Sequence, residues 1–250
     1  MRLDKYLSER TEFSRSQIKD LAAAGKISVN GSVARKVNMN VTEADAVSVS
    51  GKEVRQERTV TLIMNKPAGV VSATEDRSEK TVIDLLPDEY KNQGLAPAGR
   101  LDKDTIGFLL LTNDGSLLHD LTSPKKHVPK YYRAVLARPF TQEAAQLIAE
   151  GIRLRDGTVC QPARTAAVNE SGMEILICLN EGKYHQVKRM LAATGNHVEK
   201  LCRIAMGNMV LPEDLKPGMT AVLSDKDLCK VLNTEDMFLI LLERVMKCSS

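Results

Sequence analysis

The sequence contains no tryptophan, and aromatic residues make up only 4% of its 250 residues. Its five cysteines stand far apart, with no C-x-x-C pair and no spacing typical of a metal site; reduced thiols are therefore expected. No apolar run approaches the about 20 residues that a membrane-spanning helix needs. The first ten residues also lack the apolar stretch of a signal peptide. These absences predict a globular, cytoplasmic protein that is neither disulfide-stabilised nor membrane-bound.

Glycine-rich loops that bind nucleotide phosphates are missing as well. Neither G-x-G-x-x-G nor G-x-x-x-x-G-K-[ST] occurs, and the zinc-protease pattern H-E-x-x-H is absent. The four histidines show no ligand spacing. If the protein is an enzyme, the sequence predicts that it carries out its chemistry with side chains alone.

The first 51 residues have the pattern of a small separate unit. Ser14–Gln17 matches a capping box at the start of a helix. Asn30-Gly31, between alternating apolar residues, predicts a β-hairpin. Residues 1–36 contain eight Lys or Arg and four Asp or Glu, a net charge of +4. This charge is typical either of a solvated helix face or of a surface that binds RNA phosphates.

A polar stretch at 52–58 predicts a linker to a larger domain over residues 59–232. Its strands are expected at "FLLLT", "YYRAVLA", "MEILICL" and "HVEKLCRI", and its helices at "TQEAAQLIAEG" and "KYHQVKRMLAATG". The strands outnumber the helices without a regular alternation, which favours an α+β fold with a mostly antiparallel sheet. Residues 233–250 form a tail in which "DMFLILLERVM" predicts a terminal helix packed on the body.

Two stretches place charge beside apolar segments. "GRLDKDTIGFLLLT" sets Arg100, Asp102 and Asp104 before an apolar run; such a carboxylate is either part of a structural ion pair or catalytic. "NEGKYHQVKRM" crowds cations at the start of a predicted helix, where they oppose the helix dipole. An anionic ligand bound at that helix end would remove the conflict.

Together these stretches resemble the pseudouridine synthases, specifically the RsuA-type branch that modifies small-subunit ribosomal RNA. "GRLDKDTIGFLLLT" resembles the family pattern G-R-L-D-x-x-[ST]-x-G-L-L-L-x-T, with Phe108 where leucine is commoner. "NKPAGV", "KYY", "EGKYHQVKRM" and the segment around Leu201 are similar to the other family motifs. Residues 1–51 are similar to the S-four-type RNA-binding domain.

The resemblance implies a small αα-hairpin RNA-binding domain followed by a larger, mostly antiparallel catalytic domain. It implies isomerisation of a uridine to pseudouridine in 16S ribosomal RNA, with no cofactor and no metal, because substrate and product are isomers. It assigns catalysis to Asp102, Tyr132 and Lys188. Asp102 is then the catalytic carboxylate, Lys188 offsets the cost of burying its charge, and Tyr132 stacks on a base flipped out of the RNA.

Other residues are expected to contact the substrate or the surrounding RNA. The expected substrate-binding residues are Arg100, Leu101, Lys183, His185, Gln186, Arg189 and Leu201. The expected RNA-binding residues are Arg2, Lys5, Arg15, Lys19, Lys26, Lys125, Lys126 and Lys130. The expected partner is small-subunit ribosomal RNA, either naked or in an assembly intermediate, bound by a monomer.

Two alternatives remain open. A synthase for large-subunit ribosomal RNA would share most of these motifs, but that branch tends to carry a more arginine-rich version of "EGKYHQVKRMLAATGNHV". A non-catalytic RNA-binding or ribosome-assembly protein could keep the same scaffold. The presence of Asp102, Tyr132 and Lys188 together disfavours this second alternative.

Overall fold

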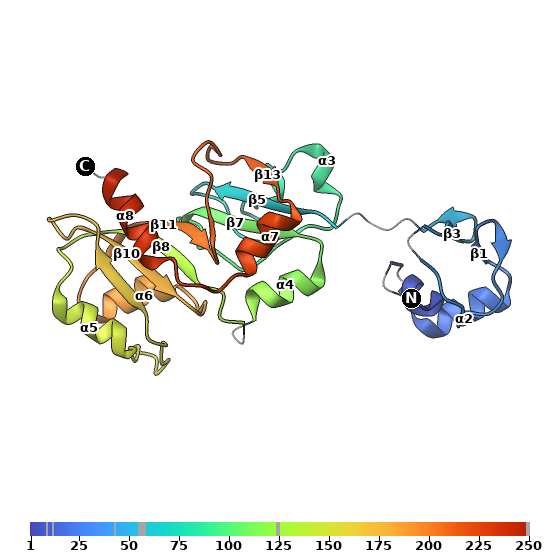
Figure 1. The fold of residues 1–250 in the computed structure, drawn as a ribbon, viewed down its shortest axis with the longest axis horizontal. Helices are drawn as coiled ribbons and strands as arrows, with labels where there is room; N and C mark the ends of the chain where they lie inside the picture. The colour runs from blue at the N-terminus through green and yellow to red at the C-terminus, as the bar shows by residue number, and fades with distance from the viewer. Residues whose placement is uncertain (9, 12, 43, 55–58, 124–125, 249–250) are drawn as a thin grey trace. The chain divides into compact units, whose positions relative to one another are not determined.

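The computed structural model describes residues 1–248 except 9, 12, 43, 55–58 and 124–125. Contacts divide the chain into two compact units, Met1–Arg58 (unit 1) and Thr59–Ser250 (unit 2) (Figure 1). Each unit has its own apolar core. The two are therefore described separately.

Unit 1 is a pair of short helices packed on a small antiparallel sheet. Helix α2 (Arg15–Ala23) begins with the expected capping box, in which Ser14 N donates to Gln17 Oε1 at 2.8 Å and Gln17 N donates to Ser14 Oγ. Asn30 and Gly31 have φ values of 51° and 78°, as a tight hairpin turn requires. The other elements are α1 (Leu3–Ser8), β1 (Ile27–Val29), β2 (Ser32–Val33), β3 (Val47–Val49) and β4 (Lys52–Glu53), in the sheet order β2-β1-β3-β4.

The structure extends unit 1 past the predicted boundary after Gly51. Lys52 and Glu53 form β4, which pairs antiparallel with β3, and Val54 N donates to Val47 O at 2.7 Å. The predicted linker is therefore corrected over residues 52–54. The polar composition hid an edge strand, whose pairing depends on backbone groups rather than on apolar side chains. Residues 55–58 lie outside the described residues.

Unit 2 is built on a larger sheet in the order β13-β5-β7-β11-β8-β10-β9, with β6 paired to β7 and β12 to β11. Its strands are β5 (Thr61–Lys66), β6 (Ala96–Pro97), β7 (Ile106–Thr112), β8 (Lys130–Leu136), β9 (Arg164–Ala167), β10 (Glu174–Leu179), β11 (Val198–Met206), β12 (Met209–Val210) and β13 (Thr220–Val222). Its helices are η1 (Ile83–Leu85), α3 (Asp88–Lys91), α4 (Gly115–Thr122), α5 (Gln142–Glu150), α6 (Gln186–Ala193), α7 (Asp225–Leu232) and α8 (Phe238–Cys248). Neighbouring strands pair antiparallel except β7 and β11, which are parallel. The α+β prediction is confirmed.

Strand β7 is apolar along most of its length because both of its faces are covered. Leu109 and Leu111 belong to a core shared with α5 and α6, whereas Phe108 and Leu110 belong to a core shared with α4 and α7. A strand buried on both faces needs a continuous rather than an alternating apolar run. This accounts for the sequence "FLLL".

Glycine is required where β7 meets β11. Gly107 has a φ of 101°, and a Cβ added there would lie 2.3 Å from the backbone oxygen of Arg203. The close approach holds β11 against the start of β7, just after the loop that carries Asp102. The glycine of the "GRLDKDTIG" motif is thus explained by packing.

The C-terminal segment packs on one face of the sheet through helix α8. Phe238, Leu241 and Val245 are buried against Tyr131 of β8. The Tyr131 hydroxyl accepts a hydrogen bond from Met237 N at 3.0 Å. Within the described residues, no helix combines the length and apolar character needed to cross a membrane.

Candidate active site

A cavity of about 710 Å³ opens on unit 2 where β8 and β11 meet the loop before β7 and the loop before α6. Both loops come from parts of the chain that are distant in sequence. Of the residues predicted from the sequence, the cavity is lined by Arg100, Leu101, Asp102, Lys130, Tyr132, Lys183, His185, Gln186 and Leu201. The fold thus brings together most of the expected site.

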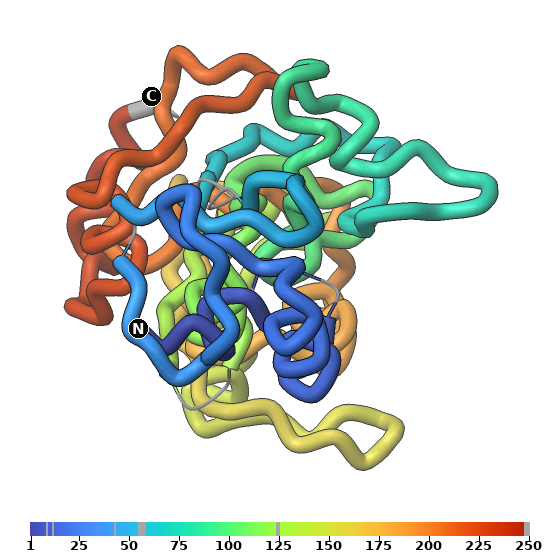
Figure 2. The backbone as a smooth tube through the Cα atoms, turned by 90° about the vertical axis from the view of Figure 1, so that its right-hand side faces the viewer, coloured from blue at the N-terminus to red at the C-terminus, as the bar shows by residue number. Residues whose placement is uncertain are grey.

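Two projecting loops border this cavity. Figure 2 shows them extending from unit 2, one in teal and one in yellow; isolated bridges between Val71 and Thr81 and between Arg153 and Val159 close them. Val71 lines the cavity. Lys183 Nζ donates to Val159 O at 2.7 Å, which ties the second loop to the cavity wall.

Asp102 is placed by the loop between β6 and β7. The preceding residue, Leu101, is buried; its N donates to Ser72 Oγ at 3.1 Å, and its carbonyl accepts from the same hydroxyl at 3.0 Å. Gly99, with a φ of 89°, lets the chain enter this loop. With Leu101 held in place, the Asp102 side chain lies at the cavity and is 22% exposed.

Lys66, at the end of β5, supports this loop from within the protein. Its side chain is fully buried, and Nζ donates to the backbone oxygens of Asp102 at 3.1 Å, Lys103 at 3.3 Å and Thr105 at 2.9 Å. Burial lowers the pKa of Lys66 to about 8, against the opposing effect of the Asp104 and Asp102 charges. Lys66 belongs to the "NKPAGV" motif, but the resemblance assigned it no role. A charged residue at the end of an apolar strand was the available signal.

Lys188 on α6 connects two carboxylates. Its Nζ lies 3.1 Å from Asp102 Oδ2 and 2.5 Å from Asp104 Oδ1, and His185 Nε2 lies 3.3 Å from Asp102 Oδ1. Burial disfavours the charge on Lys188, but the hydrogen bonds to Asp104 and Asp102 raise its pKa above the ordinary value. The hydrogen bond from Lys188 also lowers the pKa of Asp104. Lys188 is therefore a stable cation directly beside Asp102.

The cations around the start of α6 are paired with carboxylates of the protein itself. The helix begins only at Gln186, and its N-cap residue His185 has a left-handed φ of 48°. Lys183 Nζ lies 2.6 Å from Glu181 Oε2, and Arg189 forms an ion pair with Asp156. The expected conflict with the helix dipole is therefore removed internally, and this segment gives no argument for a bound anion.

Gln186 and Arg189 are engaged within the protein. Gln186 is only 4% exposed; its Nε2 donates to Glu181 Oε1 at 2.5 Å, and its Oε1 accepts from Lys183 N at 2.9 Å. Arg189 binds Asp156 and Tyr184 O and does not line the cavity. These contacts hold the loop before α6. Gln186 also lines the cavity, and the substrate contacts of both residues stay predictions.

Tyr132 and Leu201 form a wall of the cavity from neighbouring strands. They are 8% and 7% exposed. Tyr131 points to the opposite face, as alternation along β8 requires. Arg203 pairs with Tyr132 in the register of β11 and β8, and its Cζ lies 6.0 Å from the Tyr132 ring centroid. Arg203, which was not among the residues predicted from the sequence, lines the cavity and is 2% exposed.

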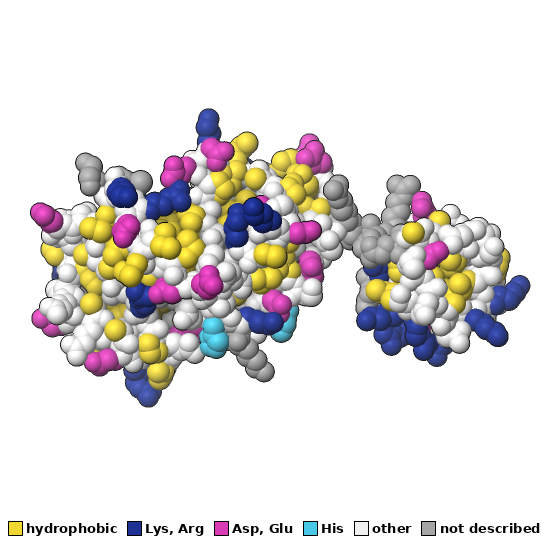
Figure 3. All heavy atoms as spheres, viewed as in Figure 1, with side chains coloured by type: hydrophobic (Ala, Val, Ile, Leu, Met, Phe, Trp, Pro, Cys, Tyr) yellow, Lys and Arg dark blue, Asp and Glu magenta, His cyan; other side chains and the backbone are white. Residues whose placement is uncertain are grey.

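The predicted RNA-binding residues of unit 1 lie at its surface. Arg15, Lys19, Lys26 and Lys5 are exposed. Figure 3 shows Lys and Arg side chains gathered along the edge of this unit where Figure 1 places α2. Arg2 is held by Asp4 through two hydrogen bonds of 3.1 and 2.8 Å. The exposed cations form a surface suited to a polyanion.

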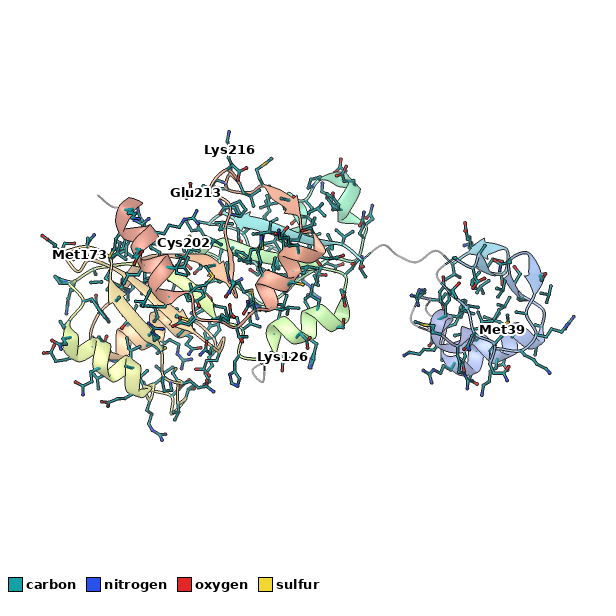
Figure 4. All side chains as sticks on the ribbon, in the orientation of Figure 1. Met39, Lys126, Met173, Cys202, Glu213 and Lys216 are labelled. Atoms are coloured by element: carbon teal, nitrogen blue, oxygen red, sulfur yellow. The ribbon has the colours of Figure 1, made fainter. Side chains whose placement is uncertain are left out.

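The predicted RNA-binding lysines of unit 2 differ in position. Lys126, labelled beyond α4 in Figure 4, lies 3.3 Å from a carboxylate oxygen of Asp120. Lys130 is a cavity residue rather than a surface residue, and its Nζ donates to Val128 O at 2.8 Å. Burial and the neighbouring Arg203 charge lower the pKa of Lys130 to about 8. Lys125 lies outside the described residues.

Fold and site together define a class of protein. Unit 1 presents exposed cations, and unit 2 holds a carboxylate between a lysine and a histidine, beside an aromatic ring, in a cavity large enough for a nucleotide. Over the described part of the chain, no cluster of three or more His, Cys, Asp and Glu has the geometry to hold a metal. This arrangement is that of an enzyme that acts on a base of RNA.

The comparisons with known proteins identify the family. The family model "RNA pseudouridylate synthase" matches residues 60–193, and the S4 domain matches residues 1–47. An uncharacterized RNA pseudouridine synthase of Bacillus subtilis is 43% identical, over 91% of this chain and 97% of its own length. The ribosomal small subunit pseudouridine synthase A of Vibrio vulnificus is 39% identical, over 92% of this chain and 99% of its own.

A solved structure agrees with these matches. The crystal structure of a pseudouridylate synthase superposes with a TM-score of 0.66 at 33% identity and covers 92% of this chain and 99% of its own. The chain belongs to the RNA pseudouridine synthase family and carries an S4 domain at its N-terminus. The family predicted from the sequence motifs is confirmed.

Proposed function

We propose that this enzyme isomerises a uridine of small-subunit (16S) ribosomal RNA to pseudouridine, acting in the cytoplasm as a monomer. The observation that carries the proposal is the Asp102 carboxylate, held between Lys188 and His185 in a cavity walled by Tyr132 and Leu201. The relatives named as small-subunit synthases, from Vibrio vulnificus and Escherichia coli, support the choice of RNA.

The reaction breaks the N1–C1′ bond of uridine, turns the base and joins C5 to C1′. One proton leaves C5 and one is gained at N1, so atoms and electrons balance without an oxidant, a reductant or an energy source. Asp102 takes part either by adding to C1′ of the sugar or C6 of the base, or by assisting a glycal route. Each route needs a charged carboxylate close to the sugar–base bond.

Lys188 and the apolar wall prepare Asp102 for this role. The Lys188 ammonium group lies 3.1 Å from Asp102 Oδ2 and holds the carboxylate in place at the cavity. Tyr132 offers a ring for stacking on the uracil, and Leu201 closes the neighbouring wall. Because these groups line a cavity, the target base must leave its stack in the RNA to reach them.

The RNA affinity is assigned mainly to unit 1. Its exposed Arg15, Lys19 and Lys26 contact phosphates without reading sequence. Arg100 and His185 lie at the cavity and contact the nucleotide that enters it. The substrate is then either naked RNA or an assembly intermediate that exposes the target uridine.

Tritium release tests the proposal directly. RNA transcribed with 5-tritiated uridine loses tritium when C5 joins C1′. We expect release from small-subunit RNA or its assembly intermediates and none from large-subunit RNA. Pseudouridine mapped in ribosomal RNA from cells with and without the protein should show one missing position in 16S RNA. Release from large-subunit RNA alone would refute the RNA assignment; no release from any of these RNAs would favour a non-catalytic scaffold.

A further inference from the structure

Two cations in the cavity take no part in the arrangement around Asp102. Lys130 and Arg203, here called the cation pair, come from the neighbouring strands β8 and β11. Arg203 is opposite Tyr132 in the register of the two strands, and Lys130 is two residues from Tyr132 and therefore on the same face of β8. Both side chains line the cavity.

The Arg203 guanidinium is only partly satisfied. Nε donates to Phe108 O at 2.7 Å, but Nη2 is buried and has no hydrogen-bond partner among the described residues. Arg203 as a whole is 2% exposed. A buried donor without a partner is unfavourable and is rare in native structures unless a ligand or water completes it.

The cation pair also lacks a counter-ion. Lys183, which lines the cavity, and Lys188 and Arg189 on α6 each contact a carboxylate. Within the described parts of the chain, neither Lys130 nor Arg203 contacts a carboxylate; Lys130 Nζ donates to Val128 O and Arg203 Nε to Phe108 O instead. Burial and the Arg203 charge together lower the pKa of Lys130 to about 8. A buried and a half-buried cation on neighbouring strands, without a carboxylate, indicate that an anion completes this part of the cavity.

The cavity already accommodates a nucleotide under the proposed function, and the only anionic groups of RNA are its phosphates. We propose that Arg203 and Lys130 bind the phosphate next to the uridine that enters the cavity, and so position its sugar against Asp102. With Nε bound to Phe108 O, the guanidinium keeps Nη2 as a donor for a phosphate oxygen, and Lys130 adds a second charge. Thr122 and Ser123 line the same cavity and add hydroxyl groups. Arg203 and Lys130 are positioning residues, since the reacting atoms lie at Asp102.

Mononucleotide binding tests the phosphate site apart from the choice of RNA. Calorimetric titrations at physiological salt compare uridine, 3′-uridine monophosphate and 5′-uridine monophosphate. We expect at least one monophosphate to bind the wild-type enzyme roughly tenfold more tightly than uridine, as a charge-assisted pair of contacts would give. Lys130→Met and Arg203→Met should remove this preference and leave the affinity for uridine unchanged, whereas Arg203→Lys should retain part of it.

Controls separate a local site from general charge. Lys216→Met removes an exposed cation that does not line the cavity and should keep the full preference. Asp102→Asn should also keep it, because the phosphate is bound away from the carboxylate. Thermal unfolding shows whether Arg203→Met folds. If it does not fold, the phosphate site is tested by two measurements: the preference of the wild-type enzyme for a monophosphate over uridine, and the loss of that preference in Lys130→Met. The salt dependence of RNA binding, plotted as log K against log salt, should lose roughly one unit of slope in Lys130→Met.

Two results would overturn the inference. Equal affinities of the wild-type enzyme for uridine and both monophosphates would mean that no phosphate site exists. Equal weakening of uridine and monophosphate binding by both variants would mean that the cation pair contacts the base instead. Failure of the enzyme to modify small-subunit RNA would refute the proposed substrate but leave these mononucleotide results unaffected.

Discussion

Cations are used differently in the two units. Arg15, Lys19 and Lys26 of unit 1 extend into solvent from a helix and the residue before a hairpin. Lys188 of unit 2 is held against Asp102 and Asp104, and Lys66 is fully buried among backbone carbonyls. The exposed cations of unit 1 can attract any nearby phosphate, whereas Lys188 and Lys66 each bind particular atoms of the protein.

The physical reason for this difference is solvent. Exposed charges are screened by salt within about 10 Å and keep their side-chain freedom, so they supply salt-dependent affinity and little precision. A cation excluded from water must be satisfied by fixed partners, which then hold it in one geometry. The difference predicts that changes to the held cations of unit 2 affect chemistry, stability or contact with one particular phosphate, whereas changes to the exposed cations of unit 1 affect overall RNA affinity alone.

The largest expected effect separates the two carboxylates that share Lys188. Asp102→Asn is nearly isosteric and should fold and bind RNA, but no pseudouridine should form even with enzyme stoichiometric to RNA, because the anionic oxygen is lost. Asp104 is 73% exposed, so Asp104→Asn should reduce activity only about two- to fivefold, as for an exposed ion pair. Tritium release measures both. An active Asp102→Asn enzyme, or a folded but inactive Asp104→Asn enzyme, contradicts the assignment.

The next effect concerns the charge of Lys188. Lys188→Met should lower the rate of the chemical step by about 10²- to 10³-fold, since a preorganised charged group beside the reacting carboxylate is lost. Lys188→Arg keeps the cation and should retain much more activity. Single-turnover tritium release compares the two. If both variants were equally impaired, the exact geometry of the lysine rather than its charge would be responsible.

Lys66 should make the stability of unit 2 depend on pH. Its pKa of about 8 lies below the ordinary value of 10.5, so the unfolded chain binds more protons than the folded one between these pH values. The free energy of unfolding should therefore rise from pH 8 to pH 10.5, by up to about 3 kcal/mol from this residue. Lys66→Met should lose this contribution in urea unfolding curves.

The control for Lys66 is Lys91→Met, at the exposed end of α3, which should follow the wild-type pH dependence. Lys130, whose pKa is also lowered to about 8, should likewise make the free energy of unfolding rise over this pH range. The contribution of Lys66 is therefore the difference between the wild-type curve and the Lys66→Met curve. Parallel curves for the wild type and Lys66→Met would show that the buried ammonium does not titrate in this range.

The smallest expected effect belongs to unit 1. Replacing Arg15, Lys19 and Lys26 together with Gln should lower the salt dependence of RNA binding by about two units of log–log slope and weaken affinity about tenfold. The rate at saturating RNA should not change. The matched control replaces Lys91, Lys216 and Lys226, three exposed cations of unit 2. A chain that begins at Thr59 lacks unit 1 altogether and should show the largest loss of salt dependence. If this chain and the full chain had equal log–log slopes of RNA affinity against salt, unit 1 would not supply RNA affinity.

Local patterns were sufficient for much of the fold. The capping box at Ser14, the Asn30-Gly31 hairpin and the apolar run of β7 depend on neighbouring residues, and the structure contains each of them. The family motifs pointed to Asp102 and Lys188, which the structure places 3.1 Å apart. The polar strand β4 was missed because its pairing rests on backbone hydrogen bonds that leave no mark in side-chain composition.

The sequence by itself determined several of the longer strands and helices, the class of fold, and the carboxylate and lysine at the centre of the site, Asp102 and Lys188. Only the tertiary structure decided which polar groups satisfy one another. Gln186 and Arg189 hold the loop before α6 through Glu181 and Asp156. Lys66 donates hydrogen bonds to the backbone of the Asp102 loop. Lys130 and Arg203 lie near each other without a carboxylate. These pairings join residues distant along the chain, such as Lys66 with Thr105 or Lys188 with Asp104. Periodicity and capping are local, whereas a buried charge is satisfied by whatever the fold brings beside it.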